Sequence, residues 1–180
     1  IYCIIGNNYS DTIIIMNYKD YITEVPDFPI KGISFKDISP LLADQQMFIS
    51  CIKDMGKLIE NHLPDYWIGI DARGFIFASA LAIHFGGGVV MCRKAGKLPP
   101  TVFSHSYKTE YSEDTIQIKQ GEGTAVIVDD VLATGGTLQT TNQLCVTAGY
   151  DVISNLVLID LLYIPRTSFN LEVKSLIQYE

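Results

Sequence analysis

The sequence has few cysteines, no excess of positive charge and no long apolar run, and each shortage excludes a class of protein. No stretch approaches the roughly 18–20 apolar residues that span a bilayer, so we expect no membrane-spanning segment. The four cysteines lie far apart, without a C-x-x-C pair or a Cys/His cluster, which favours free buried thiols in a reducing, cytoplasmic compartment. A net charge of −7 argues against nucleic-acid binding.

The residues that are present suffice for one ordinary domain. The chain has 180 residues, of which 48% are apolar and 18% charged, so it can bury a core without disulfides or metal. We therefore expect a single domain over residues 16–180. Residues 1–15 lack the basic start of a signal peptide and their apolar runs are interrupted, so we interpret them as a non-functional N-terminal extension.

Two strand–helix–strand units follow from the apolar pattern. Residues 44–63 show helical spacing, with Asp44 as the expected N-cap. After this helix, short apolar runs alternate with helical segments, and such an alternation with short connections implies a mainly parallel sheet flanked by helices, an α/β fold. The first unit has a strand at 66–70, a helix at 74–85 and a strand at 89–92; the second has a strand at 124–128, a helix at 137–148 and a strand at 152–158.

Residues 93–119, between the two units, follow a different pattern. Residues 93–100 (RKAGKLPP) are basic and contain Gly and Pro, so we expect a loop there. Residues 101–111 are polar and aromatic without a helical period, and residues 115–119 (TIQIK) alternate as a half-exposed strand does. Together these residues indicate an arm that projects from the sheet.

The most informative segment is residues 126–137 (VIVDDVLATGGT). An apolar strand leads into Asp129 and Asp130 at its C-terminal end, where open α/β sheets bind ligands. The residues that follow offer backbone N–H groups, two hydroxyls and a helix N-terminus, which together bind anions: Ala133, Thr134, Gly135, Gly136 and Thr137. Acceptors for a diol beside donors for a phosphate predict a site for a ribose 5-phosphate group.

Other interpretations of this segment are weaker. Neither G-x-x-x-x-G-K-[ST] nor G-x-G-x-x-G occurs, so the segment is neither a P-loop nor a dinucleotide fingerprint. An acidic turn followed by a glycine helix end would explain DD or TGGT alone, but not all twelve positions in order.

Residues 126–137 resemble the phosphoribosyl-diphosphate (PRPP) signature of the type I phosphoribosyltransferases. Further segments resemble the adenine-specific branch of that family: residues 26–40 (PDFPIKGISFKDISP), 71–75 (DARGF), 93–99 (RKAGKLP), Glu110-Tyr111 and the C-terminal LIQYE. The resemblance implies an enzyme of purine salvage that transfers the 5-phosphoribosyl group of PRPP to adenine, giving AMP and pyrophosphate. It also implies a type I phosphoribosyltransferase fold with a small N-terminal hood (16–40) and a flexible β-arm (93–119).

The resemblance assigns residues to the two halves of PRPP. Asp129, Asp130 and residues 133–137 would hold the ribose phosphate. Two loops would bind the pyrophosphate, through Asp71, Ala72, Arg73, Arg93, Lys94 and Lys97. The resemblance also implies a cis peptide between Asp71 and Ala72. The alternatives are that Asp71 only caps the next helix, paired with Arg73, and that the basic residues form a solvated loop.

The resemblance also assigns residues to the base. Phe35 would stack on the adenine ring with Leu161 on its other face, while the backbone of Ser34 and Lys36 reads the edge of the base. Glu110 would be the catalytic residue, a general acid or base at the purine N7. The alternatives are core packing for Phe35 and a surface role for Glu110.

The resemblance further implies a homodimer and Mg²⁺ that enters with PRPP, held by substrate oxygens and water without protein side chains as ligands. Two other functions stay open: a 6-oxopurine or xanthine transferase, and a PRPP-sensing regulator on the same fold. A regulator that binds nucleic acid needs a basic face, which a charge of −7 disfavours. Residues 162–170 (LYIPRTSFN) replace the basic K-G-R-E stretch of the family, so the resemblance assigns no contacts to this C-terminal surface.

Overall fold

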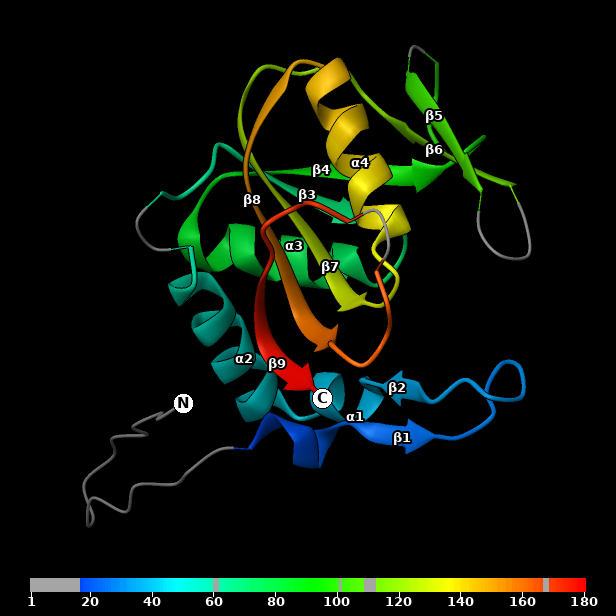
Figure 1. The fold of residues 1–180 in the computed structure, drawn as a ribbon. Helices are drawn as coiled ribbons and strands as arrows, with labels where there is room; N and C mark the ends of the chain where they lie inside the picture. Colours follow the sequence, from blue (N-terminus) through cyan, green and yellow to red (C-terminus); the bar gives the residue numbers. More distant parts are fainter. Residues whose placement is uncertain (1–16, 60–61, 101, 109–112, 167–168) are drawn as a thin grey trace, which may run out of the picture. The chain divides into compact units, whose positions relative to one another are not determined.

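The computed structural model describes residues 17–59, 62–100, 102–108, 113–166 and 169–180 (Figure 1). The chain divides into two compact units, residues 1–54 and residues 55–180, with the boundary inside helix α2 (Gln45–Lys57). The predicted extension at residues 1–15 lies outside the described residues, so its interpretation stays a prediction.

The first unit holds short elements: η1 (Tyr18–Tyr21), β1 (Thr23–Val25), β2 (Phe35–Asp37), α1 (Ser39–Ala43) and the start of α2. Strands β1 and β2 pair antiparallel, with Val25 opposite Phe35. Behind them, the buried Tyr18 hydroxyl donates to Oδ2 of Asp54 over 2.6 Å. The described part of the predicted hood is therefore a small hairpin within a unit that continues to residue 54.

Helix α2 begins where the sequence predicts and ends earlier. Oδ1 of Asp44 accepts hydrogen bonds from the backbone N–H groups of Gln46 and Met47, both over 3.0 Å, which is the geometry of an N-cap. The predicted end at residue 63 is wrong, because the helix stops at Lys57. The N–H groups of Leu58 and Ile59 donate three residues back instead of four, so the chain tightens and leaves the helical path.

The second unit is a seven-stranded sheet with strand order β5-β6-β4-β3-β7-β8-β9 and two further helices (Figure 1). Its strands are β3 (Tyr66–Ile70), β4 (Gly88–Lys94), β5 (Phe103–Lys108), β6 (Glu113–Ile118), β7 (Gly123–Leu132), β8 (Tyr150–Leu161) and β9 (Lys174–Tyr179), and its helices are α3 (Gly74–Phe85) and α4 (Gly136–Thr147). The five strands from β4 to β9 in this order are parallel, while β5 and β6 form an antiparallel hairpin on β4. The predicted mainly parallel α/β sheet is confirmed.

Two crossovers run in opposite directions from the centre of the sheet. The β3–α3–β4 connection moves to one side of β3, and the β7–α4–β8 connection moves to the other side of β7. Crossovers between parallel strands are almost always right-handed, which puts α3 and α4 on opposite faces of the sheet, and Figure 1 shows this arrangement. The strand order therefore reverses between β3 and β7, and the crevice beyond their carboxyl ends is where such sheets bind ligands.

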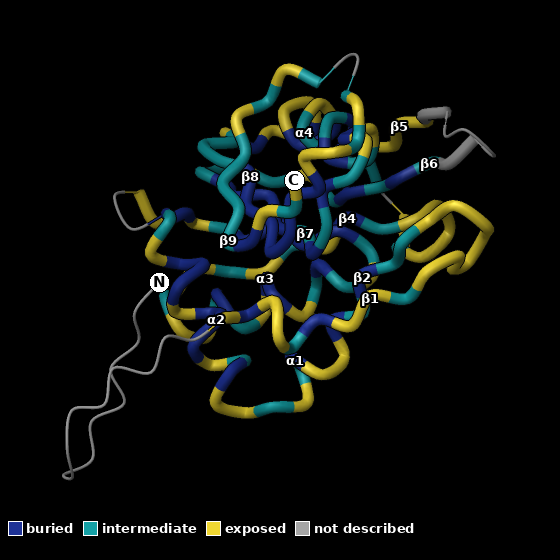
Figure 2. Tube along the Cα trace, turned by 60° about the horizontal axis from the view of Figure 1, so that its bottom comes forward, coloured by how far each residue is buried: buried dark blue, intermediate teal, exposed yellow. Residues whose placement is uncertain are grey.

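The central strands are longer than the sequence predicts. Strand β7 continues through Asp129 and Asp130 to Leu132, and β8 runs from Tyr150 to Leu161. Beyond Val128, β7 pairs with β8 alone, while the end of β8 pairs with both β7 and β9, so the sheet continues past the apolar runs that mark these strands in the sequence. Figure 2 shows the buried trace concentrated along β7 and β8, and this rigid centre fixes the strand ends that carry the polar residues.

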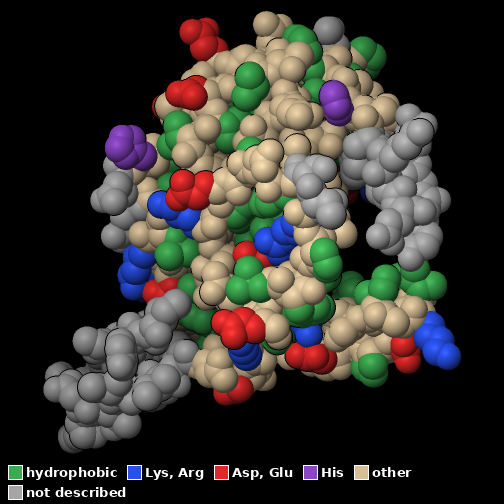
Figure 3. Space-filling model, in the orientation of Figure 1, with side chains coloured by type: hydrophobic (Ala, Val, Ile, Leu, Met, Phe, Trp, Pro, Cys, Tyr) green, Lys and Arg blue, Asp and Glu red, His purple; other side chains and the backbone are tan. Residues whose placement is uncertain are grey.

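The surface of the described residues gives two further observations. None of the described helices is long and apolar enough to cross a membrane. On the face drawn in Figure 3, Lys and Arg side chains lie among Asp and Glu side chains instead of gathering in one basic patch.

Candidate functional site

Three adjacent strands deliver charged side chains to one edge of the sheet. Strands β4, β3 and β7 lie side by side and parallel, with Ile70 opposite Cys92 and Gly69 opposite Val128. Arg93 is near the end of β4, Asp71 follows β3, and Asp129 and Asp130 lie near the end of β7. The predicted diol and pyrophosphate residues are thus brought together at the point where the strand order reverses.

Two ion pairs connect these strand ends. Nε of Arg93 lies 3.2 Å from Oδ2 of Asp71, which joins β4 to β3. Nε of Arg73 lies 2.8 Å from Oδ2 of Asp130, which joins the loop after β3 to β7. Oδ2 of Asp130 is buried without an aligned hydrogen bond among the described residues, so this second contact is primarily electrostatic. The acidic and basic groups therefore hold one another in place across the edge of the sheet.

In the loop between β3 and α3, Asp71 does not have the helix-capping role that was the alternative to pyrophosphate binding. Asp71 does not cap α3, because the N-cap position is Arg73 and no side chain of the described residues caps this helix. Asp71 instead pairs with Arg93. The Asp71–Ala72 peptide is cis, as the resemblance implies.

Gly74 allows the start of α3 to approach the end of β7. A Cβ atom at this position would lie 2.6 Å from the Val128 carbonyl oxygen and 3.3 Å from Oδ1 of Asp129. These distances are too short for any side chain. The glycine in DARG is therefore required to place the loop after β3 directly beside the acidic pair.

Burial makes both members of the acidic pair difficult to ionise, and for Asp129 the neighbouring charge adds to this effect. Desolvation and the charge of Asp130 raise the pKa of Asp129 well above its ordinary value of 3.8. Desolvation also raises the pKa of Asp130, although Arg73 opposes this shift. Oδ1 of Asp129 accepts a hydrogen bond from the backbone N–H of Asp130 over 2.9 Å, which fixes one carboxylate relative to the other.

The turn after β7 has the geometry of an anion site. Gly135 has φ of +85°, a left-handed conformation, and no side chain of the described residues caps the start of α4. A Cβ atom on Gly136 would meet nothing within 4 Å, so the backbone is open on that side, and Thr134 is exposed. The uncapped N-terminus of a twelve-residue helix, with Thr134 and Thr137 beside it, favours a phosphate group.

The basic segment begins in a strand. Arg93 and Lys94 belong to β4, so the predicted loop over residues 93–100 starts two residues later than expected. The reason is the hairpin on β4, because Arg93 and Lys94 pair with Gln117 and Ile116 of β6. Nζ of Lys119 donates to the carbonyl oxygens of Pro99 and Pro100 over 2.6 and 2.9 Å, and Lys97 is exposed on this turn.

The residues predicted to contact a base lie in different units. In the first unit, Phe35 is half-buried on β2, and its ring packs edge-on against Phe28 with centroids 5.2 Å apart. Lys36 is buried, with Nζ 2.8 Å from Oε2 of Glu24 and 3.5 Å from Oγ of Ser34. In the second unit, Leu161 is the buried last residue of β8. Glu110 and Tyr111 lie outside the described residues.

The sequence analysis missed one residue near this edge, Arg166. It follows β8 in the segment for which no role is predicted, and it donates to four oxygen atoms. A single Arg after a proline in a loop gives no periodic signal, so pattern analysis could not have identified it.

Among the described residues, no third side chain joins Asp129 and Asp130 to complete a metal site. The described residues contain no group of three His, Cys, Asp or Glu side chains that could hold a metal ion. A cavity of about 580 Å³ lies elsewhere, between the first half of β8, α4 and the segment before β9. At the candidate site, carboxylate oxygens are the only strong acceptors among the side chains described at the ends of β3 and β7.

Comparison with known proteins agrees with this geometry. The phosphoribosyl transferase domain family matches residues 37–161. The chain belongs to this family. It is 44% identical over 165 residues to an adenine phosphoribosyltransferase of Bdellovibrio bacteriovorus, covering 91% of this chain and 100% of the relative.

Solved structures of the family superimpose on the chain over most of its length. The crystal structure of an adenine phosphoribosyltransferase from Thermoanaerobacter pseudethanolicus has a TM-score of 0.84 and 38% identity, covering 90% of this chain and 98% of the other. The enzyme from Giardia lamblia, solved with 9-deazaadenine, has a TM-score of 0.81 and 31% identity, covering 91% of this chain and 96% of the other.

The buried acidic pair should lower the stability of this phosphoribosyl transferase domain. We expect Asp129→Asn to raise the free energy of unfolding at neutral pH by roughly 1 kcal/mol or more, because it removes a poorly solvated charge and keeps an acceptor for the Asp130 N–H. A raised pKa means that the native wild type binds a proton before the unfolded chain does. The advantage of the variant should therefore shrink as pH falls through the raised pKa towards 3.8.

Urea unfolding of both proteins over a series of pH values tests this expectation. Asp151→Asn, which changes an exposed carboxylate on β8, is the matched control and should show no comparable pH-dependent gain. An Asp129→Asn variant that is less stable than the wild type at neutral pH would contradict the description of a strained acidic pair.

Proposed function

We propose that this chain transfers the 5-phosphoribosyl group of PRPP to adenine, with AMP and pyrophosphate as products. The observation that carries the proposal is the acidic pair of β7 beside the uncapped N-terminus of α4, at the reversal of strand order. Relatives that cover nearly the whole chain, named adenine phosphoribosyltransferase, support the choice of base.

The ribose 5-phosphate would lie along the β7–α4 turn. Asp129 and Asp130 would accept hydrogen bonds from the two ribose hydroxyls, and residues 133–137 would donate backbone N–H groups and hydroxyls to the 5-phosphate. Gly136 supports this assignment, since the space around its Cα lets a ligand approach the backbone.

The pyrophosphate would lie between the loop after β3 and the basic turn. Arg73 and Arg93 would turn from Asp130 and Asp71 towards phosphate oxygens, assisted by Lys94, Lys97 and the backbone at Asp71 and Ala72. We propose that Mg²⁺ arrives on PRPP oxygens and water, a ligand set that this hard cation prefers, and it would neutralise charge on the leaving group.

Adenine would be recognised from the hood, with Phe35 stacked on one face and Leu161 on the other. The Lys36 side chain is engaged with Glu24 and Ser34, and we assign the reading of the base edge to the backbone of Ser34 and Lys36, as the family resemblance implies. Glu110 would act as general acid or base at N7. As the bond from C1′ to pyrophosphate breaks, the carboxylates hold the ribose while N9 of adenine attacks from the opposite side.

A panel of bases tests the reaction. With PRPP and MgCl₂, we expect nucleotide formation from adenine at a kcat/KM roughly 10³-fold or more above that for hypoxanthine, guanine or xanthine, because a site that pairs with an amine leaves buried groups unpaired against a 6-oxo base. Reactions without MgCl₂ and without PRPP are the controls. Equal rates with adenine and hypoxanthine would overturn the choice of base, and no nucleotide from any base would overturn the reaction.

Glu110→Gln separates proton transfer from binding. We expect the PRPP dissociation constant to stay unchanged while kcat falls by roughly 10²–10⁴-fold, because an amide keeps the shape of the side chain but cannot transfer a proton. Glu122→Gln, an exposed residue before β7, is the matched control. A decrease of less than about threefold would remove Glu110 from the catalytic step.

We also propose that the enzyme is a cytoplasmic homodimer. Helix α3 (GFIFASALAIHF) is apolar on all sides, a composition typical of buried helices, yet Ile83 is 88% exposed and Ile76 is 39% exposed. Strand β4 adds Val89 and Met91, both more than 40% exposed. A second copy would cover these side chains. Burial raises the pKa of the Cys51 and Cys92 thiols to about 12, and such inert free thiols support a reducing compartment.

Ile83→Asp tests the dimer. We expect the wild type to sediment at twice the 20.0 kDa of one chain and the variant at 20.0 kDa, because a buried aspartate without a partner would oppose association. Val146→Asp, at an exposed apolar position of α4, is the matched control and should leave the mass unchanged. A monomeric wild type would contradict the dimer without affecting the reaction.

A further inference from the structure

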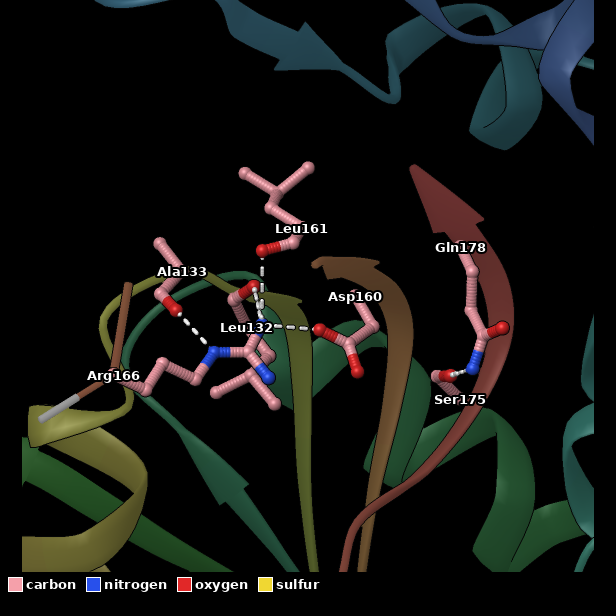
Figure 4. Close-up of polar contacts among 7 residues, drawn as sticks. All are labelled: Leu132, Ala133, Asp160, Leu161, Arg166, Ser175 and Gln178. Atoms are coloured by element: carbon pink, nitrogen blue, oxygen red, sulfur yellow. Dashed lines mark hydrogen bonds and ion pairs between the residues drawn. The ribbon is translucent and has the colours of Figure 1, made fainter. Parts of the chain in front are cut away.

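Arg166 connects the ends of the two central strands. Nε donates to the carbonyl oxygen of Ala133 over 2.7 Å, and Nη2 donates to the carbonyl oxygens of Leu132 and Leu161 over 3.2 and 3.1 Å (Figure 4). Nη2 also pairs with Oδ1 of Asp160. Leu132 and Ala133 are the last residue of β7 and the first of the anion turn, while Asp160 and Leu161 end β8.

The same side chain is held from outside by an aromatic ring. Cζ of Arg166 lies 5.8 Å from the centroid of the Phe169 ring. That ring also covers the turn, because a Cβ atom on Gly135 would lie 2.4 Å from Cδ2 of Phe169. Arg166 and Phe169 therefore enclose residues 132–135 from the side of the segment that follows β8.

We propose that Arg166 is a positioning residue for the PRPP turn, acting through the carbonyl groups of Leu132 and Ala133. A backbone that turns sharply after a strand leaves carbonyl groups without ladder partners, and a guanidinium satisfies several of them at once. With these carbonyls fixed, the N–H groups of the following residues keep the directions that a phosphate requires. This inference rests on the proposed function, since it names the turn as the phosphate site.

The requirement is for a guanidinium in particular. Arg offers five donors in a planar fork, which can reach acceptors from β7 and β8 together, whereas the ammonium of Lys is a single point charge. A Lys at this position could retain the pair with Asp160 but not the carbonyl contacts on both strands. A lysine would therefore preserve the fold through its charge but would not hold the geometry of the turn.

The experiment measures PRPP binding by calorimetry with MgCl₂ for the wild type, Arg166→Lys and Arg166→Ala. We expect the dissociation constant to rise by roughly tenfold to a hundredfold in both variants, as the loss of one or two charge-assisted hydrogen bonds predicts. In the steady state, KM for PRPP should rise more than kcat falls. Added guanidinium chloride, well below denaturing concentrations, should restore PRPP binding to Arg166→Ala but not to Arg166→Lys, whose side chain fills the site.

Lys174→Met is the matched control for a merely structural effect. Nζ of Lys174 donates to the carbonyl oxygen of Leu58 over 2.8 Å, so this variant also leaves a backbone carbonyl without its cation, but away from the turn. It should lower the unfolding temperature without changing the PRPP dissociation constant.

The outcomes separate this inference from the proposed function. A wild type that binds no PRPP overturns both. A wild type that binds PRPP, with Arg166→Lys binding it equally well, overturns the inference alone. Weaker binding in both Arg166 variants, with rescue by guanidinium and an unchanged Lys174→Met, supports it. Weaker binding in Lys174→Met to the same extent assigns the effect to general destabilisation and overturns the positioning role.

Discussion

The contact on which the edge of the sheet depends is the ion pair between Arg73 and Asp130. Two adjacent carboxylates at the end of a buried strand are poorly hydrated, so both pKa values rise, and the charge of Asp130 adds to the shift of Asp129. Arg73 is the cation that opposes this cost at 2.8 Å, and it can do so only because Gly74 lets the loop after β3 lie against β7. The strand order, the glycine and the arginine therefore form one arrangement that keeps an unfavourable acidic pair in place, as expected of a site selected for binding at the expense of stability.

Local patterns were sufficient to predict the elements that carry the site, but not how their side chains pair. The strand at residues 66–70 and the helix at residues 74–85 have the predicted bounds, because an apolar run and a small-residue helix with glycine beyond it are local signals. The pairing of Asp71 with Arg93 and of Arg73 with Asp130 depends on β4, β3 and β7 being neighbours. That lateral order is a property of the whole sheet, and a pattern along the chain does not contain it.

The remaining differences have the same origin. Strand β7 extends four residues beyond its predicted end because β8 continues to pair with it up to Leu132. Residues 93 and 94 join β4 because β6 folds back onto them, and β9 forms because the exposed edge of β8 accepts a parallel neighbour. Arg166 gains its four acceptors only when β7 and β8 end side by side. Each is an effect of tertiary pairing on residues whose own sequence preference is weak.

The ion pairs at the strand ends also suggest how a charged substrate enters without a large rearrangement. Arg73 and Arg93 pair with Asp130 and Asp71, so their guanidinium groups lie at the edge of the sheet. In the proposed reaction, a diphosphate would replace these carboxylates as the partner of each arginine, and the ribose hydroxyls would replace the arginine as the partner of Asp130. Arg73, Arg93 and Asp130 would each exchange one partner for another, so the desolvation of the acidic pair, already present in the fold, is not added to the cost of binding. Asp71 and Asp130 thus act as partners of the two arginines before the diphosphate binds, and they keep the arginine side chains ordered.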